Sequence, residues 1–180
     1  HRSEAEIRRS SLVRRVASYV GCGHAIRVAA YRDLRGYLAR PMAYAIEESD
    51  VGLQLFVRGW QVFSAEQLRV YHDTDRTHHD AAEVTASTIT NLALLAFLHY
   101  SAIDFGRGAA QVANRIAFCL RKGRIRGVAA GIGGIVTECY RNRNLRDPIS
   151  HDVLMEYLRL RQAEADSTET AGSTAFEARV

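Results

Sequence analysis

The order of apolar and polar positions divides the chain into a first part of short elements and a second part dominated by helices. Up to about residue 80, apolar runs are brief and are separated by glycine, proline and polar turns. From Ala81 to Leu160, alternation typical of strands fades and helical spacing dominates. The pattern predicts an α/β region over residues 1–80, a helical extension over 81–165 and a disordered tail over 166–180, where large apolar residues are scarce.

Within the first part, residues 16–28 (VASYVGCGHAIRV) have the pattern of two short strands on either side of a Gly-Cys-Gly turn. A short helix is expected next, with Gly36 at its C-terminal end. Pro41 then favours an extended segment just before it.

A second helix is predicted from Ser49 to Arg58, ended by Gly59. The prediction depends on four apolar residues that recur at the spacing of one buried helical face, namely Leu53, Phe56, Val57 and Trp60. The following segment, QVFSAEQLRVYH, predicts a strand, a turn and a second strand that ends at His72.

In the second part, the longest apolar run, TITNLALLAFLHYSAI, is shorter than the roughly 20 residues that a membrane-spanning helix needs. Two helices that break near Gly123 are expected next, with a basic cluster at the break formed by Arg121, Lys122, Arg124 and Arg126. The glycines of the second of these helices, Gly127, Gly131, Gly133 and Gly134, either weaken it or allow close helix packing. Pro148 and Ser150 predict the start of a last helix.

Composition adds broad limits to this picture. The chain has 180 residues, of which 47% are hydrophobic, which suffices for one domain with a real core. Its net charge is +4, and Lys122 is its only lysine. Arginine suits the binding of planar anions such as phosphate, but it is also frequent in proteins of high-GC genomes.

The three cysteines, Cys22, Cys119 and Cys139, form no metal or disulfide motif, which favours a reducing cytoplasm. The chain begins with His1 rather than Met and shows no signal peptide, so its start is interpreted as a processed or truncated end.

The candidate chemistry centres on three acids, Glu47, Glu48 and Asp50, at the start of the second predicted helix. One interpretation is structural: acids at a helix N-terminus are favoured by about 0.3–1 kcal/mol each, and Ser49 or Asp50 caps the helix. The other is functional: a carboxylate at a strand-to-helix junction faces a cleft, and neighbouring acids raise its pKa toward that of a general base.

Three segments follow one another in a specific order: GCGHAIR (residues 21–27), EESDVGLQLFVRGW (residues 47–60) and LRVYH, which ends at His72. This order resembles the second half of the catalytic domain of family-2 glycosyltransferases, which have the GT-A fold. The resemblance covers roughly residues 12–75. It continues more loosely into CLRKGRIRGVAAGIGG and RDPIS, which are similar to the basic C-terminal extension of many such enzymes.

The resemblance implies roles for individual residues. Glu48 falls at the position of the general base that takes the proton of the acceptor hydroxyl, and Glu47 and Asp50 fill the flanking acidic positions. His72 falls where many members place a metal ligand for Mn²⁺ or Mg²⁺, which neutralises the leaving nucleotide diphosphate. The turn next to the substrate would be formed by Gly21, Cys22 and Gly23, whose glycines let the backbone approach a ligand.

Two features depart from the family pattern. The nucleotide-binding half with its D-x-D motif, which should precede these segments, is absent, so the chain is expected to be an acceptor-side fragment that binds nucleotide poorly. The DTD at Asp73–Asp75 comes after the strand that ends in His and is interpreted as a turn. In addition, position 48 is a glutamate in this chain, whereas many relatives have an aspartate there.

The resulting hypothesis is an inverting, metal-dependent glycosyltransferase at the cytoplasmic face of a bacterial membrane. It would transfer a sugar from a nucleotide-diphospho-sugar to a sugar, lipid-linked or small-molecule acceptor. One alternative is a non-catalytic module whose basic helices bind a membrane surface or a partner. A self-contained metal site among His72, Asp73, His78, His79 and Asp80 is a rival for that segment. Nucleic-acid binding is disfavoured, because aromatic residues are not interleaved with the arginines.

Overall fold

The protein is described by a computed structural model, which covers residues 13–19, 21–39, 46–65, 70–71 and 82–177. The fold is mostly helical, at 67%, and the described residues include one small two-stranded antiparallel sheet. The strands lie in the first part of the chain, and the long helices lie in the second. A GT-A fold is not established by this arrangement.

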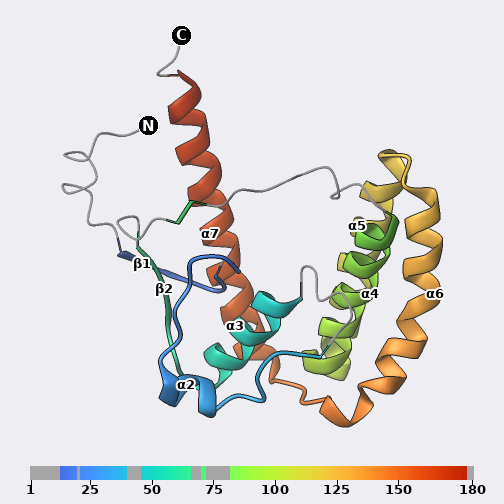
Figure 1. Cartoon of the computed structure of the whole chain (residues 1–180), viewed down its shortest axis with the longest axis horizontal. Helices are drawn as coiled ribbons and strands as arrows, with labels where there is room; N and C mark the ends of the chain where they lie inside the picture. Colours follow the sequence, from blue (N-terminus) through green and yellow to red (C-terminus); the bar gives the residue numbers. More distant parts are fainter. Residues whose placement is uncertain (1–12, 20, 40–45, 66–69, 72–81, 178–180) are drawn as a thin grey trace.

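The elements follow one another in the order β1 (Val13–Val16), α2 (Val28–Arg32), α3 (Glu47–Val57), β2 (Val62–Ala65), α4 (Ala82–His99), α5 (Phe105–Arg121), α6 (Ile125–Arg141) and α7 (His151–Glu177). Two short 3₁₀ turns, η2 (Ala102–Asp104) and η3 (Arg143–Leu145), precede α5 and follow α6. Figure 1 shows two groups of elements: the sheet, α2, α3 and α7 on one side, and α4, α5 and α6 on the other.

The sheet corrects the prediction of two strands flanking the Gly-Cys-Gly turn. Its strands β1 and β2 pair antiparallel, with Val13 opposite Ala65 and Val16 opposite Val62. Residues 21–27 form bends and irregular backbone instead. A strand needs a partner for its backbone groups, and the pairing with β2 involves only the four residues before the turn segment.

The helices of the first part lie close to their predicted positions. Helix α2 ends at Arg32, and Gly36 lies in the turn after it with a φ of +84°. Helix α3 begins at Glu47, two residues before the predicted start, because the Ile46 carbonyl already accepts the Asp50 N–H, at 2.7 Å. Ile46 therefore occupies the N-cap position that the sequence assigned to Ser49 or Asp50. After α3, Gly59 has a φ of +78°, which confirms the predicted stop.

The second part confirms the predicted helices and extends the last one. The break between α5 and α6 falls at Gly123, with a φ of +72°. Helix α7 begins directly after Ser150, whose backbone carbonyl accepts the Leu154 N–H, at 3.0 Å. It runs to Glu177, so residues 166–177 are helical where the sequence predicts a disordered tail.

Close packing of α6 on α4 explains three of the α6 glycines. A Cβ at Gly127 would meet Thr85 and the Ala82 carbonyl, and one at Gly131 would meet Ala86 and Ile89 of α4. Gly134 faces Thr90, whereas nothing lies within 4 Å of a Cβ at Gly133. Of the two interpretations of these glycines, close helix packing is therefore correct for Gly127, Gly131 and Gly134.

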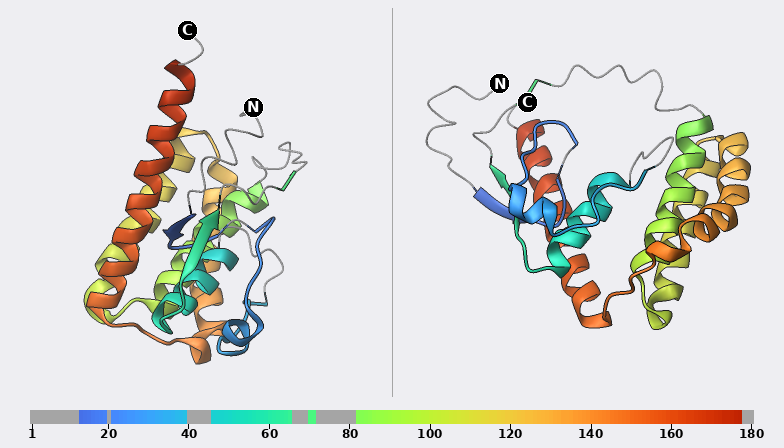
Figure 2. Two further views of the ribbon diagram at one scale, coloured as in Figure 1. Left: turned by 90° about the vertical axis from the view of Figure 1, so that its left-hand side faces the viewer. Right: turned by 60° about the horizontal axis from the view of Figure 1, so that its bottom comes forward.

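The core joins the two groups of elements. Its largest cluster contains buried residues from the segment after β1, from α3, from α4 and the residue after it, from the linker before α7 and from α7: Ala17, Leu53, Ala96, Tyr100, Ile149, Leu154 and Tyr157. Phe56 of α3 meets Tyr157 of α7 edge to face, with ring centroids 5.4 Å apart. Figure 2 shows α3 lying between α7 and α4.

Candidate functional site

The start of α3 is held against the segment that follows β1. A Cβ at Gly52 would lie 2.8 Å from the Ala17 carbonyl oxygen, so the two backbones are in close contact. Ser18 Oγ donates a hydrogen bond of 2.9 Å to the backbone carbonyl of Glu48. These contacts fix the position from which the Glu48 side chain projects.

The Glu48 carboxylate lies against the Gly-Cys-Gly turn. It accepts a hydrogen bond from the Gly21 backbone, and a Cβ at Gly21 would collide with Glu48 Oε1. From the sequence, only the resemblance predicts that Gly21 and Glu48 share one site, and the structure brings the two residues into contact.

Burial raises the pKa of Glu48 above its ordinary value. The charge of Glu47 adds to this rise, while the hydrogen bonds from the backbone of Glu48 itself and of Gly21, and the nearby His24, act in the opposite direction. The side chain is half-buried, so the carboxylate is partly dehydrated without being sealed from solvent. These are the physical conditions of a general base with a raised pKa.

Three aromatic residues that sequence reasoning did not select complete this cluster. His24 Nδ1 lies 2.8 Å from the Gly21 carbonyl oxygen, and its Nε2 lies 3.3 Å from the Tyr37 hydroxyl. Tyr19 stacks on the His24 ring, with centroids 4.5 Å apart, and its hydroxyl lies 2.7 Å from that of Tyr37. Burial, followed by the Tyr37 hydrogen bond, raises the pKa of Tyr19. Only His24 carried a sequence signal, since it lies within GCGHAIR.

A cleft of about 790 Å³ opens beside Tyr19 and His24 of this cluster, and Glu48 is not among the residues that line it. Cys22, Gly23 and His24 line it on one side, and β2 lines it through Val62, Phe63 and Ser64. Gly23 has a φ of +74°, and a Cβ there would collide with the Val70 side chain. Gly23 is therefore required by its backbone and by its contact, and Cys22 and Gly23 both face the cleft.

Trp60 also lines this cleft, at the end of α3. It packs against a small core cluster with Val51 and Leu55, and its indole N–H donates to Asp33 Oδ2 at 3.1 Å. The residue thus combines partial burial with a face on the cleft.

Asp50 lies elsewhere, and this differs from its expected place beside Glu48. It is 0% exposed. Its two oxygens accept hydrogen bonds from Arg35 Nη2 at 2.8 and 2.9 Å and from Gln54 Nε2 at 2.8 Å, and Oδ1 lies 2.6 Å from His99 Nε2. These contacts join Asp50 to α4 and to the segment after α2. They give it a structural position in the core, because a buried carboxylate needs such partners.

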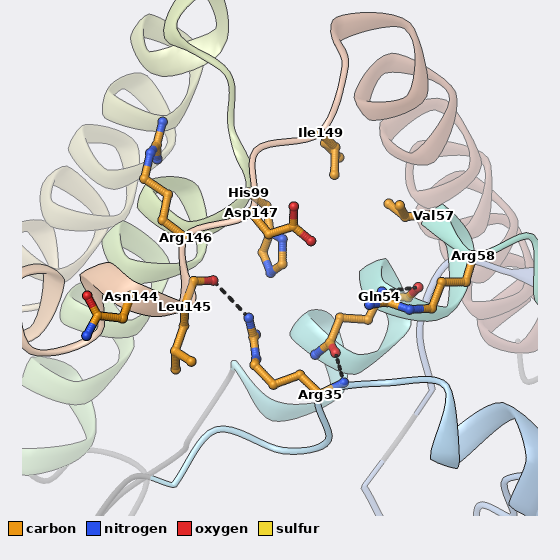
Figure 3. A pocket seen from close by; sticks show the side chains of 10 residues that line it. All are labelled: Arg35, Gln54, Val57, Arg58, His99, Asn144, Leu145, Arg146, Asp147 and Ile149. Carbon is orange, nitrogen blue, oxygen red and sulfur yellow. Dashed lines mark hydrogen bonds between the residues drawn. The ribbon is translucent and has the colours of Figure 1, made fainter.

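A smaller cavity of about 270 Å³ lies next to the Asp50 network (Figure 3). Arg35, Gln54 and His99 line it together with the linker before α7, and Arg35 Nη1 donates to the Leu145 carbonyl at 3.1 Å. Arg146 directs its guanidinium away from Arg35, where it stacks on Phe97 and Phe105. The cavity belongs to the junction of α3, α4 and the linker, away from Glu48.

The predicted metal site lies outside the part of the chain that the structure describes. His72 falls there, as do Asp73, Asp75, His78, His79 and Asp80. Among the described residues, no three His, Cys, Asp or Glu side chains come together in a way that would hold a metal ion. The Mn²⁺ or Mg²⁺ site therefore stays a prediction about His72.

Comparison of the chain with protein-family models, with curated proteins and with solved structures finds no match in any of the three. No helix in the described ranges is long and apolar enough to cross a membrane.

Proposed function

We propose that the chain is the acceptor-side part of a glycosyltransferase in which Glu48 is the general base. The observation that carries the proposal is the contact between the Glu48 carboxylate and Gly21. It joins two of the sequence segments on which the resemblance to family-2 glycosyltransferases depends. The pairing of β1 with β2 also connects the strand before the turn segment with the strand after the RGW segment.

The proposed reaction is transfer of a sugar from a nucleotide-diphospho-sugar to an acceptor hydroxyl. Glu48 removes the hydroxyl proton while the oxygen attacks the anomeric carbon. The bond from that carbon to the diphosphate breaks, and the diphosphate leaves with the electron pair, so the configuration inverts. The donor half is supplied by residues outside this chain, and Mn²⁺ or Mg²⁺ would neutralise the departing diphosphate.

The surroundings of Glu48 suit this role. Gly21 donates its backbone hydrogen bond to the carboxylate and so holds one oxygen in place. The hydroxyl of an acceptor sugar would enter from the neighbouring cleft, where Cys22 and Gly23 form one wall and Trp60 offers an aromatic surface. Glu47 adds negative charge that helps to raise the pKa of Glu48.

The test is Glu48→Gln in the protein that carries this chain, assayed with a panel of nucleotide-diphospho-sugars and sugar acceptors. The amide keeps the shape of the carboxylate but accepts no proton, so the rate of transfer should fall by about 10²–10⁴-fold. Calorimetry should show unchanged donor binding.

Glu47→Gln is the matched control, because Glu47 hydrogen-bonds the Ile46 N–H of its own helix start. Its transfer rate should stay within about tenfold of the unmodified protein, since it acts only on the pKa of its neighbour. Full activity of the Glu48→Gln variant would refute the base assignment. Failure of the unmodified protein to bind any nucleotide-diphospho-sugar would refute the function itself.

A further inference from the structure

Positive charge is concentrated on the hairpin formed by α5 and α6. Between Phe105 and Arg143 the sequence has eight basic residues, Arg107, Arg115, Arg121, Lys122, Arg124, Arg126, Arg141 and Arg143. Glu138 is the one acid in this range, so the hairpin carries a net charge of +7. The whole chain carries +4, which leaves −3 for everything else. The basic character of the protein therefore belongs to this hairpin.

The same hairpin exposes a row of apolar side chains on α6. Ile125, Ile132, Val136 and Tyr140 are 66%, 47%, 77% and 66% exposed. Their spacing of seven, four and four residues places them along one line of a helix. Ala129 and Gly133 are also exposed on this side and keep the surface between the large side chains shallow.

The row is exposed because of how α6 packs. Gly127, Gly131 and Gly134 bring the opposite side of the helix onto α4, and Val128 is buried against Ile89 and Cys119. Figures 1 and 2 show α6 at the outer edge of the molecule, on the side away from α7. The packing that buries one side of α6 therefore turns its apolar row outward.

Basic residues lie next to this row. Arg121 and Lys122 are exposed at the end of α5, and Arg126 is exposed in the first turn of α6, one residue from Ile125. Arg143 stacks on the Tyr140 ring at the other end, 4.2 Å from its centroid. An exposed apolar row with cations at both ends is typical of a helix that lies in the interface of an anionic bilayer.

We propose that the outer face of the α5–α6 hairpin binds the surface of a bilayer that contains anionic lipids. The apolar side chains of α6 enter the boundary between headgroups and acyl chains, and the basic residues contact the headgroups. Duplex nucleic acid fits this face less well, because its phosphates would pair with the arginines but leave Ile132 and Val136 exposed. The inference is independent of the proposed sugar transfer.

The experiment is cosedimentation of the full chain with vesicles of phosphatidylcholine, with and without phosphatidylglycerol. The protein should pellet only with the anionic vesicles, and pelleting should weaken as salt rises from about 0.1 M to about 0.5 M. Arg121→Gln combined with Arg126→Gln should reduce partitioning by about 30-fold at the lower salt concentration. Val136→Ser should reduce it by about fivefold.

Matched controls lie outside the hairpin. Arg32→Gln with Arg159→Gln removes the same charge from α2 and α7, and Val28→Ser removes an apolar side chain that is 63% exposed on α2. These variants should pellet like the unmodified protein, and circular dichroism should show that all variants are folded.

Three results would overturn the proposal. One is the absence of binding to anionic vesicles. Another is binding that neither the hairpin variants nor the lipid charge changes. The third is a gel shift with duplex DNA that the hairpin variants abolish while vesicles are not bound, which would assign the face to nucleic acid.

Discussion

The Glu48 carboxylate lies so close to Gly21 that it fits only because Gly21 has no side chain. Gly21 does not have a positive φ, so its backbone would accept alanine, and the new Cβ would collide only with the Glu48 side chain. Gly21 and Glu48 are far apart in the sequence but in contact, whereas Asp50 and Glu48 are close in the sequence but have different neighbours. It stands two residues from Glu48 in the chain, but its partners are Arg35, Gln54 and His99 in the core.

Gly21→Ala should therefore move the Glu48 carboxylate without unfolding the protein. The new Cβ meets the flexible end of the Glu48 side chain, so the free energy of unfolding should change by only about 0.5 kcal/mol. Loss of the Gly21 hydrogen bond should raise the pKa of Glu48, because that bond now lowers it. Carbon-13 NMR titration of the Glu48 carboxyl measures this shift.

Gly106→Ala is the control for this change, because nothing lies within 4 Å of a Cβ there. It should leave the Glu48 titration unchanged. An identical titration curve for the Gly21→Ala variant would show that the contact between the two residues does not control the carboxylate.

At the scale of elements, α6 depends on its neighbour rather than on its own composition. Four glycines within 17 residues weaken an isolated helix, at about 1 kcal/mol each relative to alanine. Three of them face α4 and allow the backbones to approach. The close approach of α4 and α6 allows packing contacts along much of both helices. These contacts offset the low helix propensity of α6.

Gly131→Ala and Gly133→Ala separate these two effects. Both changes give the same gain in helix propensity, up to about 1 kcal/mol. At Gly131 the new Cβ would lie 2.9 Å from the Ala86 carbonyl oxygen and 3.0 Å from Ile89 Cβ, so overpacking should cost about 1–3 kcal/mol. Urea unfolding should therefore show Gly133→Ala to be the more stable variant.

Equal stability of the two variants would mean that α4 and α6 move apart readily at this point. Both residues lie on α6, two positions apart, so the two variants differ in what each new Cβ meets. Far-UV circular dichroism would confirm that both variants keep their helix content.

At the scale of the molecule, polar contacts hold the start of the long helix α7 and the linker before it against the α4–α5 junction. Apolar packing in the core adds to these contacts. Asp104, which is buried just before α5, accepts a hydrogen bond of 2.6 Å from Ser101 Oγ. Its other oxygen lies 2.8 Å from Nδ1 of His151, the first residue of α7. The Asp147 and Ile149 N–H groups donate to the last carbonyls of α4, which holds the linker in place.

The tie through Asp104 should depend on pH. The hydrogen bond from Ser101 and the contact with His151 lower the pKa of Asp104. A carboxyl whose pKa is lowered in the folded state stabilises it above the unfolded pKa of about 4, and this contribution is lost as the pH falls through the folded value. Asp104→Asn should therefore be less stable than the unmodified protein at pH 7, and the difference should shrink at an acidic pH below about 4.

Urea unfolding at both pH values measures this difference. Asp152→Asn removes an exposed carboxylate from the first turn of α7 and is the control. A stability difference between the Asp104 variant and the unmodified protein that stays constant with pH would show that the carboxylate charge does not hold the junction.

The sequence alone determined where most helices lie and where they stop, because apolar spacing and glycine at a chain turn act within a few neighbouring residues. Helices α3, α5, α6 and the start of α7 follow from such local patterns, and so does β2. The sequence also singled out Glu48, although only a resemblance connected it with Gly21.

Only the tertiary structure decided which neighbours in sequence share a site. Glu48 and Asp50 project from one helix in different directions, so one meets the turn at Gly21 and the other meets His99, 49 residues away. The role of Tyr19 and Tyr37 around His24, the side of α6 that its glycines bury, and the pairing of β1 ahead of the turn all depend on partners far along the chain. Local periodicity carries no information on such partners, because burial and hydrogen bonding between distant segments are decided only when the whole chain packs.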